Sequence, residues 1–210
     1  MTVIAVIAAG AMGASVGRKL VDAGNIVLTD LEGRSDATLK RAHDAGMIRT
    51  SWTDIIRKAD MILSIIPPRD AFFFAERVLA EFQGTERVDK GPLVFADCNA
   101  VNVDSIKKTA ALFSTSPIIF LDACIIGGPP SGDYVPTFYG SADVLDQQGL
   151  ALFKDVIEKS GIKVRVLNGD GAGIGDASAL KMSYAASIRL QIYYARSLID
   201  KFLIRAFLKV

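Results

Sequence analysis

The residues with the clearest chemical meaning lie near the start of the chain, where an apolar run leads into AAGAMG at residues 8–13. A strand, a G-x-G-x-x-G loop and a helix, in this order, bind the pyrophosphate of a dinucleotide. Ala8 replaces the first glycine, whereas Gly10 would allow the backbone to approach the phosphates and Gly13 would allow close helix–strand packing. Amides at the start of the following helix would favour an anion. The loop predicts a dinucleotide site, although two glycines also suit a simple tight turn.

Polar residues after the second predicted strand bear on which dinucleotide would bind. Asp30 lies 17 residues after Gly13, near the spacing of an acid that binds the ribose 2′-hydroxyl of NAD. Arg34 and Ser35 follow it and would suit the 2′-phosphate of NADP. Each also has a simpler interpretation, since Asp30 could be a turn residue and Arg34 a solvated loop charge. Both cofactors stay open, with NADP slightly favoured.

The choice of acid–base groups is limited by the histidine count. His43 is the single histidine and lies in the polar, helix-like segment LKRAHDAG, where a solvated position explains it most simply. A Ser-His-Asp triad, a Cys-His pair or a multi-histidine metal site is therefore disfavoured, and no metal is expected. Proton transfer should use Lys, Asp, Glu or Tyr. Cys98 and Cys124, 26 residues apart, suit neither a disulfide framework nor a zinc site and are expected to be packing residues.

Apolar runs of strand length alternate with amphipathic stretches of helix length along most of the chain. Strands are predicted at residues 3–8, 25–30, 61–67, 93–97, 117–123, 136–140 and 162–167, and helices near 12–23, 36–45, 69–82, 103–113 and 150–160. Because several runs are apolar throughout, the strands should be buried on both faces, as in a parallel sheet covered by helices. The pattern predicts a doubly wound α/β domain with a mostly parallel sheet over residues 1–168. A glycine-rich breaker and one long C-terminal helix follow over 169–210.

Composition excludes several other classes of protein. Half of the 210 residues are hydrophobic and 22% are charged, which suits a packed core and excludes disorder. The formal net charge of +1 gives no electrostatic reason to expect nucleic acid as a partner. No apolar run reaches the roughly 18 uncharged residues that span a bilayer, and the uncharged N-terminus lacks the basic start of a signal peptide. A cytoplasmic location is expected.

Four segments, taken in order, resemble one enzyme superfamily. They are AAGAMG at 8–13, SIIPP at 64–68, DACIIGGPP at 122–130 and GAGIGDASALKMSYAA at 171–186. From residue 1 to about 187, the chain resembles the β-hydroxyacid dehydrogenase and 6-phosphogluconate dehydrogenase superfamily. LEGRS and ALKMSYAA look more like its phosphogluconate or L-threonate dehydrogenase branch. The resemblance implies a Rossmann-type domain that binds NAD or NADP, and the oxidation of a small hydroxy acid by hydride transfer.

The resemblance also implies particular cofactor residues. Ile66 and Pro67, after the strand at 61–67, would lie along the cofactor, and Asn99 would lie near the nicotinamide. The full set of expected cofactor residues, from the loop, the second strand and the resemblance, is Gly10, Ala11, Met12, Gly13, Asp30, Arg34, Ser35, Ile66, Pro67 and Asn99.

On the substrate side, the family's D-A-P-V-S-G-G motif falls on Asp122 to Gly128. Within it, Ile126, Gly127 and Gly128 are expected to form the loop that binds substrate. Ile126 takes the place of a serine and cannot donate a hydroxyl group. Ala185 stands where the family typically has a substrate-binding asparagine, and Tyr184 beside it is the remaining polar candidate. These replacements leave the identity of the hydroxy acid open.

Lys181 falls on the family's catalytic lysine. Oxidising an alcohol requires a base that takes the hydroxyl proton, and a lysine partly removed from water can serve because burial lowers a lysine's pKa. A short-chain dehydrogenase would instead need Tyr-x-x-x-Lys, and none of the five tyrosines has a lysine four residues later. The simpler alternative is that Lys181 only extends from an amphipathic helix into water.

The C-terminal segment departs from the family, whose members continue into an all-helical domain that closes the substrate cleft. From Ser187 to Val210 the likeness is lost. Two functions stay open: a dehydrogenase with a more open pocket, or a catalytically inactive NAD(P)-binding or dimerising remnant. The apolar last helix predicts a homo-oligomer formed through residues 188–210, with attachment to a membrane surface as the rival. Its apolar residues are Ile188, Ile192, Tyr193, Leu198, Ile199, Phe202, Leu203, Phe207 and Leu208.

Overall fold

Eight strands form one sheet in the computed structural model, which describes the backbone of residues 1–88 and 90–207 and the side chains of 1–88 and 90–194. The strands are β1 (Val3–Ile7), β2 (Ile26–Thr29), β3 (Ile48–Arg49), β4 (Met61–Ser64), β5 (Val94–Asp97), β6 (Ile119–Ile126), β7 (Thr137–Ser141) and β8 (Lys163–Val166). Their order across the sheet is β3-β2-β1-β4-β5-β6-β7-β8. Neighbours are parallel, except that β6 and β7 are antiparallel. The predicted doubly wound, mostly parallel sheet is confirmed.

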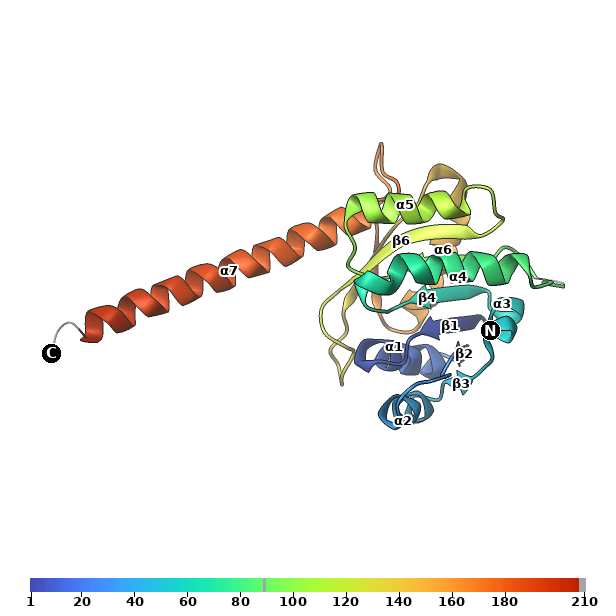
Figure 1. The fold of residues 1–210 in the computed structure, drawn as a ribbon, viewed down its shortest axis with the longest axis horizontal. Helices are drawn as coiled ribbons and strands as arrows, with labels where there is room; N and C mark the ends of the chain where they lie inside the picture. Colours follow the sequence, from blue (N-terminus) through green and yellow to red (C-terminus); the bar gives the residue numbers. More distant parts are fainter. Residues whose placement is uncertain (89, 208–210) are drawn as a thin grey trace.

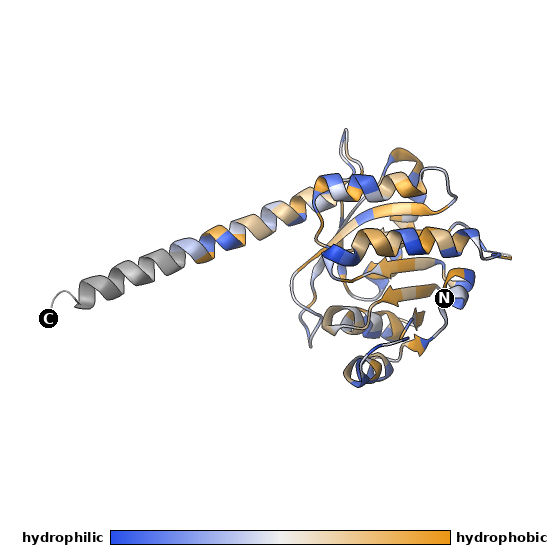
Figure 2. Cartoon of the chain, viewed as in Figure 1, coloured by the Kyte–Doolittle hydropathy of each residue, from blue (hydrophilic) through white to orange (hydrophobic). Residues whose placement is uncertain are grey.

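Helices cover both faces of this sheet (Figure 1). They are α1 (Ala11–Asp22), α2 (Asp36–Asp44), α3 (Trp52–Lys58), α4 (Ala71–Gln83), α5 (Val103–Phe113) and α6 (Gln147–Lys159), with short 3-10 turns at Pro68–Asp70 and Val144–Asp146. One face packs against α1, α2 and α6, and the other against α3, α4 and α5. The apolar strands lie between the two helical layers, where Figure 2 shows them in orange.

The alternation of side chains along β1 produces two separate cores. Ile4 and Val6 belong to the core beneath α1, α2 and α6, whereas Ala5 and Ile7 belong to the core beneath α3, α4 and α5. All four side chains are buried. Burying a side chain such as Ile4 or Val6 contributes about 1.5–3 kcal/mol. This central strand therefore holds the loop at residues 8–13 on a rigid support.

Most of the observed elements match the sequence-based prediction to within a few residues, but β3 and α3 are absent from that prediction. β3 has only two residues, both exposed, which is too short for a periodic pattern. α3 has seven residues and is capped by Ser51, whose hydroxyl accepts the Asp54 N–H at 3.2 Å. β6 also runs three residues beyond the predicted strand, which brings Ile126 to its end.

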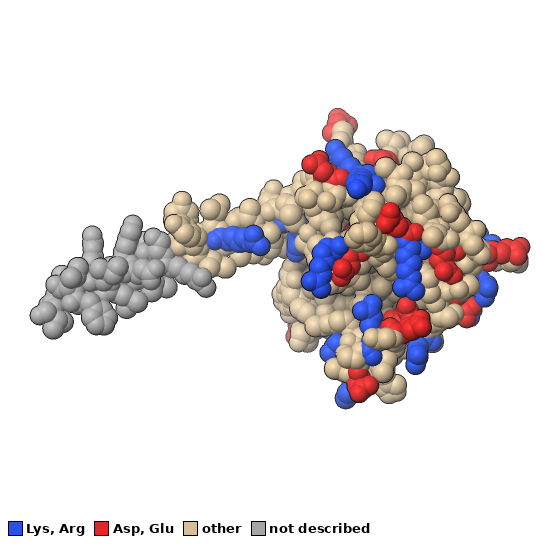
Figure 3. Space-filling model, viewed as in Figure 1, with Lys and Arg blue, Asp and Glu red and all other residues tan. Residues whose placement is uncertain are grey.

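Charged side chains of both signs are intermixed on the face shown in Figure 3. Some form exposed pairs along helices, such as Lys40 and Asp44 at 2.6 Å on α2. His43 lies on the same helix with its side chain 91% exposed. The single histidine is thus a solvated surface residue, as its polar sequence context predicts.

The last helix, α7 (Asp176–Phe207), begins against β6 and β7 and then extends away from the domain (Figure 1). Leu190, Ile192, Tyr193 and Tyr194 are each at least half exposed. The side chains of 195–210 lie outside the described residues, and with them Leu198, Ile199, Phe202, Leu203, Phe207 and Leu208 of the predicted apolar surface. Within the described part of the chain, no helix combines the length and hydropathy needed to cross a membrane.

Candidate functional site

The carboxyl ends of β1 and β4 lie at the position where an open α/β sheet is expected to have its ligand-binding crevice. The chain passes from β1 to α1 on one face of the sheet and from β4 to α4 on the other, so the strand order reverses here. Open α/β sheets bind ligands at such a switch point. The Ala8 N–H donates to the Ile65 carbonyl oxygen at 3.3 Å, which joins the loop at 8–13 to the end of β4.

The loop at 8–13 combines free space at Gly10 with backbone amides at the start of α1. The first hydrogen bond within α1 runs from the Ala14 N–H to the Gly10 carbonyl oxygen at 2.9 Å, so the earlier amides of the turn have no partner within the helix. A Cβ added to Gly10 would meet nothing within 4 Å, whereas one on Gly13 would collide with the Ala8 carbonyl oxygen. Gly10 thus borders free space and Gly13 permits close packing. The residues fit a bound pyrophosphate.

Asp30 lies directly after β2, at the predicted ribose end of the crevice. Its Oδ1 atom accepts the Glu32 N–H at 3.0 Å, and its Oδ2 atom lies 3.8 Å from Nη2 of Arg77 on α4. The carboxylate remains 18% exposed. Arg34 and Ser35 are exposed in the turn that precedes α2. Asp30, the residue expected for NAD, and Arg34 and Ser35, the residues expected for NADP, are therefore all accessible at this end.

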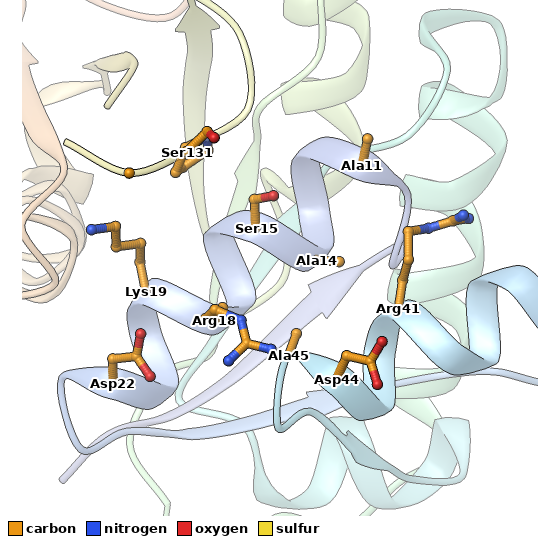
Figure 4. Close-up of a pocket in the computed structure, with 12 residues that line it drawn as sticks. Ala11, Ala14, Ser15, Arg18, Lys19, Asp22, Arg41, Asp44, Ala45 and Ser131 are labelled. Carbon is orange, nitrogen blue, oxygen red and sulfur yellow. The ribbon is translucent and has the colours of Figure 1, made fainter. Parts of the chain in front are cut away.

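Arg41 is a basic residue beside the loop that sequence reasoning missed. Its Nε atom donates to the Ala9 carbonyl oxygen at 3.2 Å, and its Nη2 atom donates to Oγ1 of Thr38 at 2.9 Å. The side chain borders a hollow of about 560 Å³ between α1, α2 and residues 130–132 (Figure 4). Arg18 and Lys19 of α1 also line the hollow. No local spacing marks Arg41, because α2 simply carries it to the loop from 32 residues away.

Asn99 follows β5, and its side chain is fully engaged within the protein. Its Oδ1 atom accepts the Ile66 N–H at 2.8 Å, and its Nδ2 group donates to Asp97 at 2.7 Å and to Ser64 at 2.9 Å. Only 4% of the residue is exposed. Asn99 therefore ties the segment at Ile66 and Pro67 to the ends of β4 and β5 in this structure.

The Asp97 carboxyl group is buried beneath Asn99. Burial raises its pKa from 3.8 to about 6; hydrogen bonds from Asn99 oppose this shift, and the Asp122 carboxylate adds to it. Its Oδ2 atom has no hydrogen-bond partner among the described residues. Because the folded chain holds this proton more tightly than the unfolded chain, the resulting stability is complete below pH 3.8 and is lost as the pH rises through about 6.

Asp97→Asn should remove the loss of folding stability that accompanies the ionisation of Asp97. Relative to wild type, the variant should gain up to about 3 kcal/mol of unfolding free energy between about pH 4 and pH 7, because a shift of about two pKa units is worth that much. Urea unfolding across this pH range measures the difference. Asp155→Asn, at an exposed carboxylate paired with Lys159, is the control and should show little change. A pH-independent difference between Asp97→Asn and wild type would contradict the titration of Asp97.

Lys181 and the predicted substrate loop lie together where α7 meets β6. The Lys181 ammonium group donates to the Ile125 carbonyl oxygen at 2.6 Å. Gly127 has φ +125, and a Cβ there would collide with the Tyr134 hydroxyl oxygen, so the turn requires glycine. That hydroxyl oxygen also accepts the Gly128 N–H at 2.9 Å. The lysine is thus held one residue before the loop that starts at Ile126.

Two other predicted features complete this region. Tyr184 lies one turn beyond Lys181 on α7 and is 41% exposed. Cys124 is buried, and its thiol lies 3.2 Å from the Ala177 carbonyl oxygen. Burial raises the pKa of Cys124 to about 12, with a further contribution from Asp122. A thiol held protonated in this way is a packing group, as the sequence predicts for Cys98 and Cys124.

Residues 3–167 match the family described as the NAD binding domain of 6-phosphogluconate dehydrogenase. The match runs from β1 to the end of β8 and includes the loop at 8–13 and the crevice between β1 and β4. The chain belongs to this family. Membership confirms the resemblance noted in the sequence and identifies the loop as part of a nicotinamide-dinucleotide-binding domain. No curated protein matches the sequence.

Solved structures share this fold at low sequence identity. The Mycobacterium tuberculosis 3-hydroxyisobutyrate dehydrogenase with L-serine has a TM-score of 0.72 and 22% identity, covering 96% of this chain and 66% of that one. A conserved protein of unknown function, described as similar to 3-hydroxyacid dehydrogenases, has a TM-score of 0.68 and 24% identity, covering 88% and 64%. An imine reductase variant from Myxococcus stipitatus in complex with NAD+ has a TM-score of 0.69 and 15% identity, covering 94% and 64%. The chain spans just under two thirds of the length of these proteins.

Proposed function

We propose that this chain acts as an oxidoreductase that transfers a hydride between a nicotinamide dinucleotide and a small hydroxy acid. Lys181 carries the proposal, because its ammonium group lies 2.6 Å from the Ile125 carbonyl oxygen, directly before the loop expected to bind substrate. The family match supports the cofactor, and the similarity to 3-hydroxyacid dehydrogenases supports the substrate class. The substrate would resemble phosphogluconate, hydroxyisobutyrate or threonate.

Each part of the site has a separate task in this proposal. The amides of the loop at 10–13 bind the pyrophosphate, and Asn99 holds Ile66 and Pro67 in place along the cofactor. In oxidation, the neutral amine form of Lys181 takes the proton from the substrate hydroxyl group and becomes the ammonium form, which returns the proton in reduction. The bound nicotinamide supplies the hydride acceptor or donor.

Polar contacts to the substrate would come from few groups. Ile126 offers no hydroxyl group, and the Gly128 N–H already donates to Tyr134. The backbone of Gly127 and the exposed Tyr184 hydroxyl group are the remaining candidates in the predicted set. This arrangement favours a small acid whose carboxylate meets backbone and whose hydroxyl group faces Lys181.

The alternative function is a catalytically inactive, nucleotide-binding protein. Ile126 and Ala185 favour it, because apolar side chains stand at two positions where the family resemblance implies substrate contacts. Turnover of a panel of small hydroxy acids with NAD and NADP supports the dehydrogenase, whereas cofactor binding without turnover supports the alternative. A cytoplasmic location is also part of the proposal, and two buried, unpaired cysteines are compatible with a reducing compartment.

Arg34→Ala tests the choice between NADP and NAD. If Arg34 contacts the 2′-phosphate, the substitution should weaken NADP binding by about 1.5–3 kcal/mol, the value of a lost charge-assisted hydrogen bond. NAD binding should change little, because NAD lacks that phosphate. Isothermal titration calorimetry with both cofactors measures the difference, and Arg69→Ala, at another exposed arginine, is the control. Equal losses for both cofactors would contradict the role of Arg34 and favour Asp30 with NAD.

We also propose that the chain self-associates through α7. Leu190, Ile192, Tyr193 and Tyr194 leave apolar surface exposed along this helix, and such surface commonly marks an interface. Sedimentation at micromolar concentration should show a dimer or larger oligomer, and Ile192→Asp combined with Tyr193→Asp should shift it to the monomer. A wild-type monomer would contradict self-association. Binding of that monomer to anionic vesicles would instead support attachment to a membrane surface.

A further inference from the structure

The buried carboxylate of Asp122, in the middle of β6, contacts the start of α7. Its Oδ2 atom accepts the backbone N–H groups of Gly175 at 2.9 Å and Ser178 at 3.1 Å. Its Oδ1 atom accepts the Ser178 hydroxyl group at 2.8 Å, and the Ser141 hydroxyl group lies 3.4 Å from Oδ2. Asp122 has no exposed surface. A side chain of the sheet thus supplies the cap that helices usually receive from a residue beside their first turn.

The surroundings explain why a charged group is tolerated at this depth. Burial raises the pKa of Asp122, and the hydrogen bonds from Ser178, Gly175 and Ser141 oppose this rise by stabilising the carboxylate. The positive end of the α7 dipole faces the same oxygen atoms. Gly175 has φ +113, a backbone conformation that glycine adopts without a steric penalty. The turn before α7 is therefore shaped to direct its N–H groups at Asp122.

Three contacts in sequence join α7 to β6. Asp122 accepts the Ser178 hydroxyl and N–H groups, the Cys124 thiol contacts the Ala177 carbonyl oxygen, and the Ile125 carbonyl oxygen accepts the Lys181 ammonium group. Lys181 lies three residues after Ser178, so both side chains project from nearly the same side of the helix. Rotation or translation of the first turn of α7 would move the Lys181 ammonium group by a comparable distance.

We infer that Asp122 is a positioning residue, which sets the rotation and depth of α7 against β6 and thereby places Lys181 beside the substrate loop. The inference rests on the proposed function for the role of Lys181, but the anchoring itself concerns only this chain. Asp122 touches neither cofactor nor substrate in this scheme. Its effect reaches the reaction through the helix that carries the lysine.

Asp122→Asn keeps the size of the side chain but replaces one acceptor oxygen with an NH2 group that faces the N–H donors of α7. Nitroxide labels at Lys108→Cys on α5 and Arg189→Cys on α7 report the placement of the helix by pulsed electron paramagnetic resonance. Both positions are exposed, and the native cysteines are buried, so labelling is selective. Diluted with an excess of unlabelled chain, so that distances between protomers do not contribute, the otherwise wild-type labelled chain should give one narrow distance distribution. Asp122→Asn should broaden or shift this distribution.

Asp143→Asn is the matched control, because the Asp143 carboxylate accepts the Ile174 N–H at 3.2 Å just before α7 and is exposed. Its distance distribution should match the wild type. If Asp122→Asn does not fold, Ser178→Ala, which removes only the hydroxyl donor, should broaden the distribution in the same direction. An unchanged distribution in Asp122→Asn, or in Ser178→Ala where only that variant folds, would overturn the inference.

Kinetics of the unlabelled chain separate positioning from a general loss of stability. In folded Asp122→Asn, kcat should fall by roughly 100-fold, since a displacement of about 1 Å in a reacting group can cost that much. The dissociation constant of the cofactor should stay within about twofold of wild type. The loop at 10–13 follows β1, whereas Asp122 lies on β6. Unchanged kcat in an active enzyme would overturn the positioning role. A wild-type chain without turnover would overturn the proposed function, and the distance measurement would still decide whether Asp122 anchors α7.

Discussion

Gly10→Val should weaken the binding of NAD and NADP by roughly 100-fold, about 2.8 kcal/mol, without disrupting the fold. A Cβ at this position meets nothing within 4 Å, and the backbone φ of −69° suits a residue with a side chain. The added methyl groups would enter the free space over the first amides of α1, where the pyrophosphate is expected. Calorimetric titration measures affinity, and thermal unfolding confirms that the variant is folded.

Gly91→Val is the matched control, because a Cβ at Gly91 also meets nothing within 4 Å but lies before β5, away from the crevice. It should bind both cofactors as the wild type does. Folded Gly10→Val with unchanged affinity would show that the loop is not the cofactor site. Gly13→Val is less selective, because its Cβ collides with the Ala8 carbonyl oxygen, so we expect it to lose folding stability together with binding.

Lys181→Met should lower kcat by about 100- to 10,000-fold, the contribution typical of a general acid or base. Methionine retains most of the aliphatic length of lysine but cannot accept or return a proton. Cofactor affinity should stay unchanged, because Lys181 contacts the Ile125 carbonyl oxygen and not the loop at 10–13. Initial rates with a small hydroxy acid and either cofactor, together with calorimetry, test both statements.

Arg189→Met is the control for this substitution. It removes a cation two turns further along α7, at an exposed position, and should leave kcat close to wild type. Full activity in Lys181→Met would refute general-base catalysis by this residue and leave Lys181 as a structural contact to β6. A loss of cofactor binding in the same variant would show that the substitution disturbs the fold and does not act on the chemical step alone.

The order of the longer elements could be read from the sequence, which also predicts the cofactor loop and the candidate lysine. Strand-length apolar runs alternating with helical patterns determine a doubly wound sheet, because each strand must be buried between two helical layers. The spacing of Gly10 and Gly13 predicts the turn into α1 for a local reason, since a Cβ at Gly10 would border free space and one at Gly13 would collide with the Ala8 carbonyl oxygen. Short elements such as β3 and α3 were not predicted, because two to seven residues carry too little periodic signal.

Only the tertiary structure decided which distant residues act together at the site. Arg41 reaches the Ala9 carbonyl oxygen across 32 positions, and Asn99 reaches the Ile66 N–H across 33. Asp122 and Ser178 are 56 positions apart, and the sequence marks Asp122 only as the first residue of the family's substrate motif. Local patterns report which side of a helix or strand is buried, but they carry no information on which buried group meets which. That pairing depends on how strands and helices stack in three dimensions, which is why the anchoring of α7 emerges only from the folded chain.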